Sequence, residues 1–583
     1  MANYKVCGCF SRTFKIAAVT PPKDVEDVFQ KYAQNGCMNS SQLQQFLIDM
    51  QGQTEATLTD AENILRTQLQ SKIFPILQPN GLSLDLFFWY LLNTNLNPPY
   101  DCRVHHDMES PLSHYFIFTG HNSYLTGNQL SSDCSDKPIV KALRKGVRVI
   151  ELDLWPNSTK DKVHVLHGRT LTTPVQLDKC IAAIKEHAFI ASEFPVIITL
   201  EDHLTPPLQA LAAKIITETL GDILYYPKKK EKFKEFPSPE SLKRRILIST
   251  KPPKEFESGN LHEEITDGNN TGDWGKEIPD YSDEIASHDN HVHLSVQELE
   301  SSDEESETKK LKNAAPEYKK IITIRAGKPK GSSLKDALTV GDEDAKRVSL
   351  SEPQLEKLAK AHPSQIIRFT QKHILRVYPY GLRVDSSNYN PLVSWTHGAQ
   401  MVALNMQGYG RPLWLVQGFF RANGGCGYVK KPAFLLPTDG EKVFSPRDQH
   451  PIKMTLRVKV YMGLGWLERF GKNYFDKYSP PDFYTRVGIA GVPADTKMKK
   501  THTIEDAWSP NWGVEFEFPL TVPEIALLRV EVHEYDMSEK DDFGGQTCLP
   551  VMELKTGYRS IPLYDKRGDE LAGVRLLFRI QFV

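Results

Sequence analysis

Short runs of apolar, β-branched residues, each followed by polar side chains, dominate the segment between residues 115 and 203. Continuous runs of this kind are typical of strands that are buried on both faces. Polar, helix-compatible stretches separate the runs, and strand–helix alternation with polar strand ends is typical of a (β/α) barrel. The pattern predicts strands at residues 116–120, 147–150, 163–166 and 196–200.

The polar residues at these four strand ends form one chemical set: Asn122, Glu151, Asp153, Glu201, His121 and His167. Three carboxylates and an amide carbonyl are hard oxygen ligands, which suit calcium. Glu151 and Asp153 are two residues apart, so in a strand both side chains point to the same side. The histidines titrate near neutrality and are free to move protons. The set therefore predicts metal-assisted attack on a phosphodiester, although any one of these residues alone would be an ordinary polar strand end.

Several longer stretches resemble phosphoinositide-specific phospholipase C. Residues 119–125, 149–155, 165–171 and 198–203 resemble its first catalytic half, and residues 381–391 and 423–432 resemble its second half. The resemblance spans roughly residues 24–583. No segment like a pleckstrin-homology domain precedes it, as in the plant-type members of the family.

The resemblance implies a mechanism in which the 2-hydroxyl of the substrate attacks its own phosphorus. Glu151 or Glu201 takes the hydroxyl proton, His121 stabilises the phosphoryl oxygens, and His167 protonates the departing diacylglycerol oxygen. The calcium ligands would be Asn122, Glu151, Asp153 and Glu201. The resemblance also implies that four further residues contact the headgroup phosphates: Lys251, Ser349, Arg376 and Tyr378.

The rest of the barrel is predicted from residues 245–250, 374–379, 401–406 and 427–431, which bring the number of strands to eight. An acidic linker, residues 257–313, divides the barrel into halves at 101–256 and 314–440. Residues 257–307 contain sixteen Asp and Glu, one Lys and no Arg, so this segment cannot bury enough apolar surface to order itself. We expect it to restrain the enzyme at anionic membranes; a passive tether is the alternative.

The flanking segments differ in pattern. Residues 24–100, after a tail at 1–23, have helical periodicity and resemble an EF-hand lobe, but the loop at 34–41 has no Asp or Glu, so usual calcium binding is excluded there. This lobe is expected to support the barrel. Residues 441–583 alternate with the period of strands and predict a sandwich that resembles a C2 domain. Its candidate calcium ligands are Asp482, Glu534, Asp536 and Asp542; a calcium-free docking module is the alternative.

The composition of the chain restricts the cellular location and the kinds of partner that we expect. At 583 residues the chain should hold several domains, and its net charge of −2 gives no sign of nucleic-acid binding. Eight cysteines without paired spacing, no signal peptide and no apolar run of membrane-spanning length predict a cytoplasmic protein. Contact with the plasma membrane would then be peripheral, through an anionic surface. An apolar rim at the barrel mouth is expected from Leu130, Leu171, Tyr380 and Leu382.

These observations predict a multidomain, calcium-dependent phospholipase C. It would cleave phosphatidylinositol 4,5-bisphosphate and related phosphoinositides to diacylglycerol and inositol phosphate through a cyclic phosphodiester, and would act in lipid and calcium signalling. A non-catalytic adaptor that binds phosphoinositide and calcium is one alternative, and a barrel resembling glycerophosphodiesterases is another. The histidine pair argues against the adaptor, because binding alone needs no proton donor.

Overall fold

The computed structural model describes residues 2–7, 10–14, 19–69, 81–226, 233–250, 315–326, 338–340, 344–437, 443–536 and 540–583. Lys251 and the acidic linker at 257–313 lie outside the described residues, as does any contact of that linker. The described residues form two compact units. One contains the chain up to Asp101 and from Gln449 onward, and the other contains the described chain from Cys102 to Asp448.

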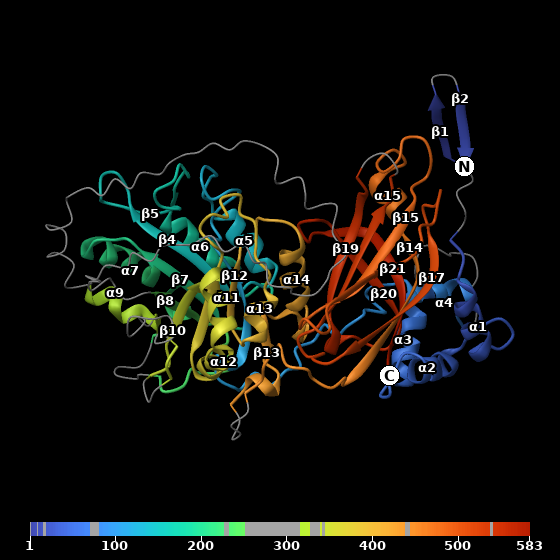
Figure 1. The fold of residues 1–583 in the computed structure, drawn as a ribbon, viewed down its shortest axis with the longest axis horizontal. Coiled ribbons are helices and arrows are strands. Elements are labelled where there is room, and N and C mark those ends of the chain that lie inside the picture. Colours follow the sequence, from blue (N-terminus) through green and yellow to red (C-terminus); the bar gives the residue numbers. More distant parts are fainter. Residues whose placement is uncertain are drawn as a thin grey trace. The chain divides into compact units, whose positions relative to one another are not determined.

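A parallel β-barrel forms the core of the second unit (Figure 1). In sheet order its strands are β10 (Arg347–Ser351), β11 (Ile374–Tyr378), β12 (Met401–Leu404), β3 (Tyr115–Gly120), β4 (Val149–Pro156), β7 (Val196–Asp202), β8 (Ile246–Thr250) and β9 (Ile322–Arg325). A parallel bridge between Ala326 and Arg347 joins the two ends of this series. The predicted (β/α)8 barrel is therefore confirmed.

Two of the predicted barrel strands were assigned wrongly. β5 (Val163–Val165) pairs antiparallel with β4 and with β6 (Val175–Gln176), and β13 (Tyr428–Lys430) pairs antiparallel with β3. Their places in the barrel are taken by β9 and β10. The apolar run at 163–166 is an antiparallel extension of β4, so His167 follows a hairpin strand rather than a barrel strand.

Several helices pack against the barrel strands through one apolar face. In α6, for example, Leu177, Cys180, Ile181 and Ile184 are buried, at the i, i+3, i+4, i+7 spacing of one helix face. Among its described residues, the α-helices of this unit are α5 (Lys137–Arg144), α6 (Leu177–His187), α7 (Pro206–Leu220), α9 (Pro316–Ile321), α11 (Glu352–Ala361), α12 (Pro363–Lys372), α13 (Leu392–Thr396) and α14 (Arg411–Phe419).

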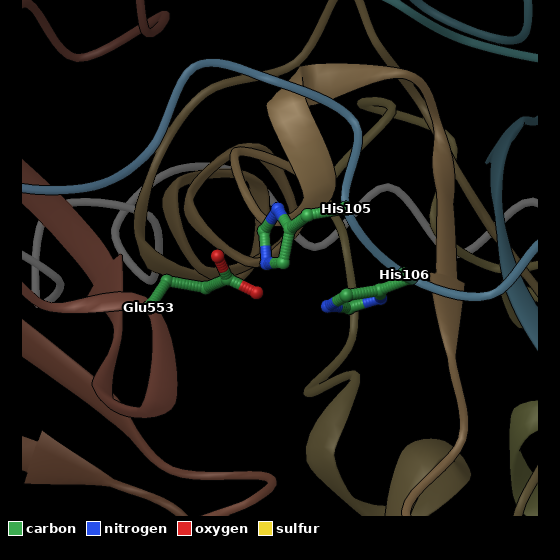
Figure 2. Close-up of side chains that lie close together, drawn as sticks. All are labelled: His105, His106 and Glu553. Atoms are coloured by element: carbon green, nitrogen blue, oxygen red, sulfur yellow. The ribbon is translucent and has the colours of Figure 1, made fainter. Parts of the chain in front are cut away.

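The segment that enters the barrel is fixed by one buried amide. The Asn423 Oδ1 atom accepts hydrogen bonds from the backbone N–H groups of His105 and His106, both at 2.8 Å. The two imidazole rings stand edge to face, with centroids 4.8 Å apart (Figure 2). His106 Nδ1 in turn accepts from the backbone N–H of Lys430 in β13. The resembling stretch at 423–432 thus anchors the start of the barrel near its first strand.

An antiparallel sandwich forms most of the first unit. Its strand order is β16 (Lys497–Lys500), β15 (Phe483–Ala490), β18 (Leu527–Glu534), β19 (Asp542–Pro550), β20 (Gly557–Tyr564), β21 (Glu570–Phe582), β14 (Met454–Leu464) and β17 (Asn511–Leu520). A single residue pair, Gln546 with Tyr564, joins β19 to β20. The chain therefore folds as two four-stranded layers around one apolar core, as predicted. A short helix, α15 (Trp466–Phe470), follows β14.

The EF-hand-like lobe consists of α1 (Lys23–Tyr32), α2 (Ser40–Asp49), α3 (Leu58–Leu69) and α4 (Leu84–Leu91). Its apolar core continues into the sandwich, where Tyr461 and Leu577 belong to the same buried cluster. Polar contacts reinforce this junction: Gln51 and Tyr558 exchange hydrogen bonds, and Arg559 donates to Asn97. The lobe was expected to support the barrel, but the partner within its own unit is the sandwich.

The predicted tail contains a short hairpin of β1 (Ala2–Cys7) and β2 (Phe10–Phe14). Tyr4 is buried, and its hydroxyl accepts a hydrogen bond from Trp508 Nε1 at 2.9 Å. None of the helices in the described part of the chain combines the length and the apolarity needed to cross a membrane.

Candidate active site

The three carboxylates meet at the carboxyl ends of two neighbouring barrel strands. Glu151 and Asp153 lie on β4 and Glu201 on β7, and Asp153 is in register with Glu201. One oxygen from each carboxylate lies within 4.8 Å of the others. Glu151 and Asp153 are buried, whereas the Glu201 side chain is 45% exposed. The cluster therefore has one open side, which faces the solvent.

Asp153 has the surroundings of a metal ligand. Its Oδ2 atom accepts a hydrogen bond from the Tyr124 hydroxyl at 2.8 Å, while its Oδ1 atom is buried and has no hydrogen-bond partner among the described residues. Burial raises the pKa of this carboxyl, and the charges of Glu201 and Glu151 raise it further. A cation would satisfy the orphaned oxygen and offset the repulsion, so the donor set fits a hard divalent ion.

Asn122 joins this cluster through both its backbone and its side chain. The residue has a left-handed backbone (φ 42°), which its short polar side chain tolerates, and its N–H donates to Glu151 Oε2 at 3.2 Å. The side-chain Nδ2 donates to Gln129 Oε1 at 3.0 Å. Because the amide nitrogen is engaged by Gln129, the carbonyl oxygen is the atom that Asn122 can offer to a cation.

Arg376 reaches the same cluster from β11. Its Nη2 lies 2.5 Å from Glu151 Oε2, and both side chains are almost fully buried. Ser349 is the register partner of Arg376 on β10, and the Tyr378 ring lies 5.5 Å from the guanidinium carbon. Of the four residues expected to bind headgroup phosphates, Arg376 contacts a carboxylate directly, and Ser349 and Tyr378 lie next to Arg376. Arg376 also has a structural contact, the ion pair with Glu151.

His121 follows β3 and is held at the edge of the cluster. Its Nδ1 lies 2.9 Å from Asn405 Oδ1, and its Nε2 lies 4.0 Å from Glu151 Oε2. Burial lowers the pKa of His121, and the charge of Glu151 opposes that shift. A ring that is neutral at rest and adjoins a carboxylate is suited to gain a proton when negative charge develops next to it.

His167 is positioned by the β4–β5 hairpin and by a backbone carbonyl. Its Nδ1 donates to the Gln129 carbonyl oxygen at 2.8 Å, because only a protonated nitrogen can bond to a carbonyl. The other ring nitrogen, Nε2, is therefore the atom that can exchange a proton with a substrate. The structure thus places both predicted histidines at the barrel mouth, each with its Nδ1 fixed.

Three polar residues of the site were missed by the sequence analysis: Gln129, Ser386 and Asn405. The Gln129 Nε2 atom donates to Ser386 Oγ at 2.8 Å and to Asn405 Oδ1 at 3.1 Å. Asn405 directly follows β12, so the strand-end pattern that identified the carboxylates applies to it as well. Ser386 lies inside the recognised stretch at 381–391. Gln129 lies in a loop, and no pattern in the sequence distinguishes it.

The residues predicted to form an apolar rim are all exposed: Leu130, Leu171, Tyr380 and Leu382. Leu171 and Leu382 are 83% and 73% exposed, which is unusual for large apolar side chains. The backbone N–H of Leu171 donates to the Leu130 carbonyl, and that of Gln129 donates to Val384, both at 2.8 Å. These bonds bring three loops together at the barrel mouth.

The candidate calcium ligands of the sandwich lie at neighbouring strand ends. Glu534 is in register with Asp542, and its Oε1 accepts from the backbone N–H of Asp482 at 3.5 Å. Burial raises the pKa of Glu534 to about 8, with Asp542 and Asp482 adding to the rise. Asp536 lies two residues beyond β18. Among the described residues, however, no three of these carboxylates lie as close together as those of the barrel.

Comparison with known proteins identifies the family. The X domain of phosphatidylinositol-specific phospholipase C matches residues 108–252, the Y domain matches 325–434, and a C2 domain matches 454–565. The chain is 56% identical to phosphoinositide phospholipase C 2 of Arabidopsis thaliana, over 100% of this chain and 99% of the relative.

More distant relatives agree with this result. The delta-3 1-phosphatidylinositol 4,5-bisphosphate phosphodiesterase of Mus musculus is 33% identical, over 96% of this chain and 68% of its own length. The crystal structure of L. pealei PLC21 superposes on this chain with a TM-score of 0.72 and a sequence identity of 26%, and the match covers 96% of this chain and 68% of that one. The chain therefore belongs to the phosphoinositide-specific phospholipase C family and is an enzyme that hydrolyses the phosphodiester of phosphoinositide lipids.

Proposed function

We propose that this enzyme is calcium-dependent and cleaves phosphatidylinositol 4,5-bisphosphate and related phosphoinositides to diacylglycerol and inositol phosphate through a cyclic phosphodiester. The observation that carries the proposal is the close group of three carboxylates, Glu151, Asp153 and Glu201, with two fixed histidines next to it. A neutral binding pocket would need neither the crowded negative charge nor the two imidazoles.

The ion would be held by Asn122, Glu151, Asp153 and Glu201. When bound, calcium would lower the pKa of the attacking hydroxyl and offset negative charge on the phosphorus oxygens. The orphaned Asp153 Oδ1 atom and the raised pKa of Asp153 support this ligand set.

Side chains of the protein would carry out the proton transfers of both reaction steps. Glu151 or Glu201 takes the proton of the 2-hydroxyl as that oxygen attacks phosphorus. His121, once its Nε2 has taken a proton from solvent, donates that N–H to the phosphoryl oxygens as charge develops on them. His167 enters the step with protons on both nitrogens and gives the one on Nε2 to the departing diacylglycerol oxygen; Nε2 later takes a proton from the water that opens the cyclic phosphodiester. The bond from His167 Nδ1 to the Gln129 carbonyl supports this role because it leaves Nε2 for the exchange.

The headgroup would be recognised by Lys251, Ser349, Arg376 and Tyr378. Arg376 has five N–H donors, so its pairing with Glu151 leaves others for a phosphate. Ser349 and Tyr378 lie in the same strand pair, which supports a phosphate position beside Arg376.

The enzyme would act as a peripheral protein at the cytoplasmic face of the plasma membrane, in lipid and calcium signalling. The exposed rim of Leu130, Leu171, Tyr380 and Leu382 supports insertion into the lipid interface. The C2 domain would bind the anionic surface, with calcium held by Asp482, Glu534, Asp536 and Asp542. The register of Glu534 with Asp542 and the contribution of the Asp542 and Asp482 charges to the Glu534 pKa support this placement, although burial is the larger cause of that rise.

The experiment that tests this function compares three reactions. Purified protein is given vesicles containing phosphatidylinositol 4,5-bisphosphate with calcium, the same vesicles with a chelator, and a soluble glycerophosphodiester with calcium. We expect release of inositol phosphate in the first reaction alone. Binding to vesicles without release would favour the adaptor, and faster cleavage of the soluble diester would favour a glycerophosphodiesterase.

A further inference from the structure

A continuous series of three hydrogen-bonded side-chain amides begins at the proposed metal ligand Asn122 and ends at His121. The Asn122 Nδ2 atom donates to Gln129 Oε1 at 3.0 Å, and Gln129 Nε2 donates to Asn405 Oδ1 at 3.1 Å. Asn405 Oδ1 lies 2.9 Å from His121 Nδ1. We call Asn122, Gln129 and Asn405 the amide chain. All three residues are buried, so solvent cannot replace these bonds without cost.

Two bonds orient the Asn405 amide, one to each of its ends, and Gln129 Nε2 supplies the donor toward Oδ1. The Asn405 Nδ2 atom donates to the backbone carbonyl of Ser387 at 3.3 Å, so Oδ1 is the atom that faces Gln129 and His121. An oxygen can only accept, and His121 must therefore carry its resting proton on Nδ1. Any second proton goes to Nε2, the nitrogen nearest Glu151.

Gln129 is also the residue that holds the other histidine. Its carbonyl oxygen accepts from His167 Nδ1 at 2.8 Å, and its backbone N–H donates to the Val384 carbonyl at 2.8 Å. One buried loop residue thus bonds directly to His167, through Asn405 to His121, and to the amide of Asn122.

We propose that Gln129 is a positioning residue, which sets the tautomer of His121 and the orientation of Asn122 through its side chain, and the tautomer of His167 through its backbone. This inference rests on the proposed function, because it assigns Gln129 to the reaction that those residues would perform. The chemistry explains why a glutamine is needed. The amide chain requires an acceptor toward Asn122 and a donor toward Asn405, whereas Glu offers two acceptors and Leu offers neither.

The test uses two variants of this residue and one matched control. Gln129→Glu keeps the size and the acceptor but removes the donor, and Gln129→Leu removes both. The control is Gln407→Leu. Gln407 donates to the same Ser386 hydroxyl and to the Gly127 carbonyl, both at 3.2 Å, but makes no bond to the amide chain or to either histidine among the described contacts.

On a soluble short-chain phosphoinositide, we expect kcat of both Gln129 variants to fall about 100-fold, the loss typical of a catalytic group displaced by about 1 Å. KM should stay at the native value, and Gln407→Leu should keep native kcat. Equal losses in Gln129→Glu and Gln407→Leu would reduce Gln129 to a loop support and overturn the inference. If Gln129→Leu does not fold, the isosteric Gln129→Glu decides.

A second readout needs neither calcium nor turnover. In the calcium-free protein labelled with ¹⁵N-histidine, nitrogen shifts report the tautomer of His121, which the spectrum of a His121→Gln variant identifies. We expect protonated Nδ1 in the native protein and in Gln407→Leu, and loss of that preference in Gln129→Glu. An unchanged tautomer in Gln129→Glu would overturn the inference. A native protein that releases no inositol phosphate from vesicles with calcium would instead refute the proposed function, and the tautomer measurement does not depend on that result.

Discussion

Replacing Asp153 by Asn should lower the affinity of the barrel for calcium without lowering the stability of the calcium-free barrel. The carboxyl lies within 4.8 Å of two others, its pKa is raised by burial and by their charges, and its Oδ1 atom has no partner among the described residues. An uncharged amide adds no repulsion to this group. We therefore expect Asp153→Asn to melt, in the presence of a chelator near pH 8, at the native temperature or above it.

The variant should differ from the native protein when calcium is added, because calcium should stabilise it less. Asp153→Asn removes one unit of negative charge from the ligand set, and a pair of opposite unit charges about 4 Å apart attract by about 4 kcal/mol at an effective dielectric constant of about 20, which exceeds the ~2.7 kcal/mol of a hundredfold change in Kd. Calcium at a hundred times the native Kd stabilises the native protein by about 2.7 kcal/mol, but a variant with a hundredfold higher Kd by only about 0.4 kcal/mol. For a unit of about 300 residues, with an unfolding entropy of about 2.1 cal/mol/K per residue, the difference corresponds to about 3–4 °C in melting temperature.

The assay is thermal melting with and without calcium, in a background that carries Asp482→Asn and Asp536→Asn so that the sandwich does not contribute. The control is Asp202→Asn, the same change one residue from Glu201. Asp202 accepts hydrogen bonds from Leu204 and Gln209 rather than joining the cluster, so Asp202→Asn should keep the native calcium shift. A native-sized calcium shift in Asp153→Asn, or a lower melting temperature in chelator, would refute the reasoning.

Three further predictions follow from the same structure. His121→Ala and His167→Ala should each lose about 10²–10⁴-fold in kcat with unchanged melting temperature, and near-native kcat in either would remove that histidine from the mechanism. Leu130→Ser with Leu382→Ser should lower activity on vesicles but spare hydrolysis of soluble cyclic inositol phosphate; equal losses on both substrates would indicate a folding defect. Burial lowers the pKa of His397 to about 4, so the unfolded chain binds more protons between pH 6.5 and 4, and stability should fall as the pH falls through that range, by up to about 3 kcal/mol. His397→Gln should flatten this loss in melts at pH 7, 6 and 5, and an unchanged slope would exclude His397 as its source.

The carboxylate cluster could be predicted from the sequence because its geometry is local to a sheet edge. Parallel strands end at the same edge, so polar residues after Ile150 and Leu200 had to meet, and the register of Asp153 with Glu201 brings them together. The same reasoning would have found Asn405 after β12. Gln129 could not be found in this way, because its partners Ser386 and Asn405 lie 257 and 276 residues away.

The strand assignments show the limit of hydrophobic pattern. The apolar run at 163–166 predicted a barrel strand, yet three of its residues form the antiparallel β5, because an apolar run does not show the direction of pairing. β10 was missed because Arg347, Ser349 and Ser351 alternate with its apolar residues. β10 lies beside Arg376 on β11, and polar residues interrupt its apolar run next to the site.

In the proposed mechanism, the substrate's own hydroxyl attacks phosphorus at a calcium-dependent site with two histidines. Phosphorus NMR of vesicle hydrolysis in ¹⁸O-water tests it most directly. We expect a cyclic phosphodiester without ¹⁸O to appear first, only when calcium is present, and then to be converted to a monoester that carries one ¹⁸O. A labelled monoester that forms from the start with no cyclic product, or turnover that persists in a chelator, would contradict the account.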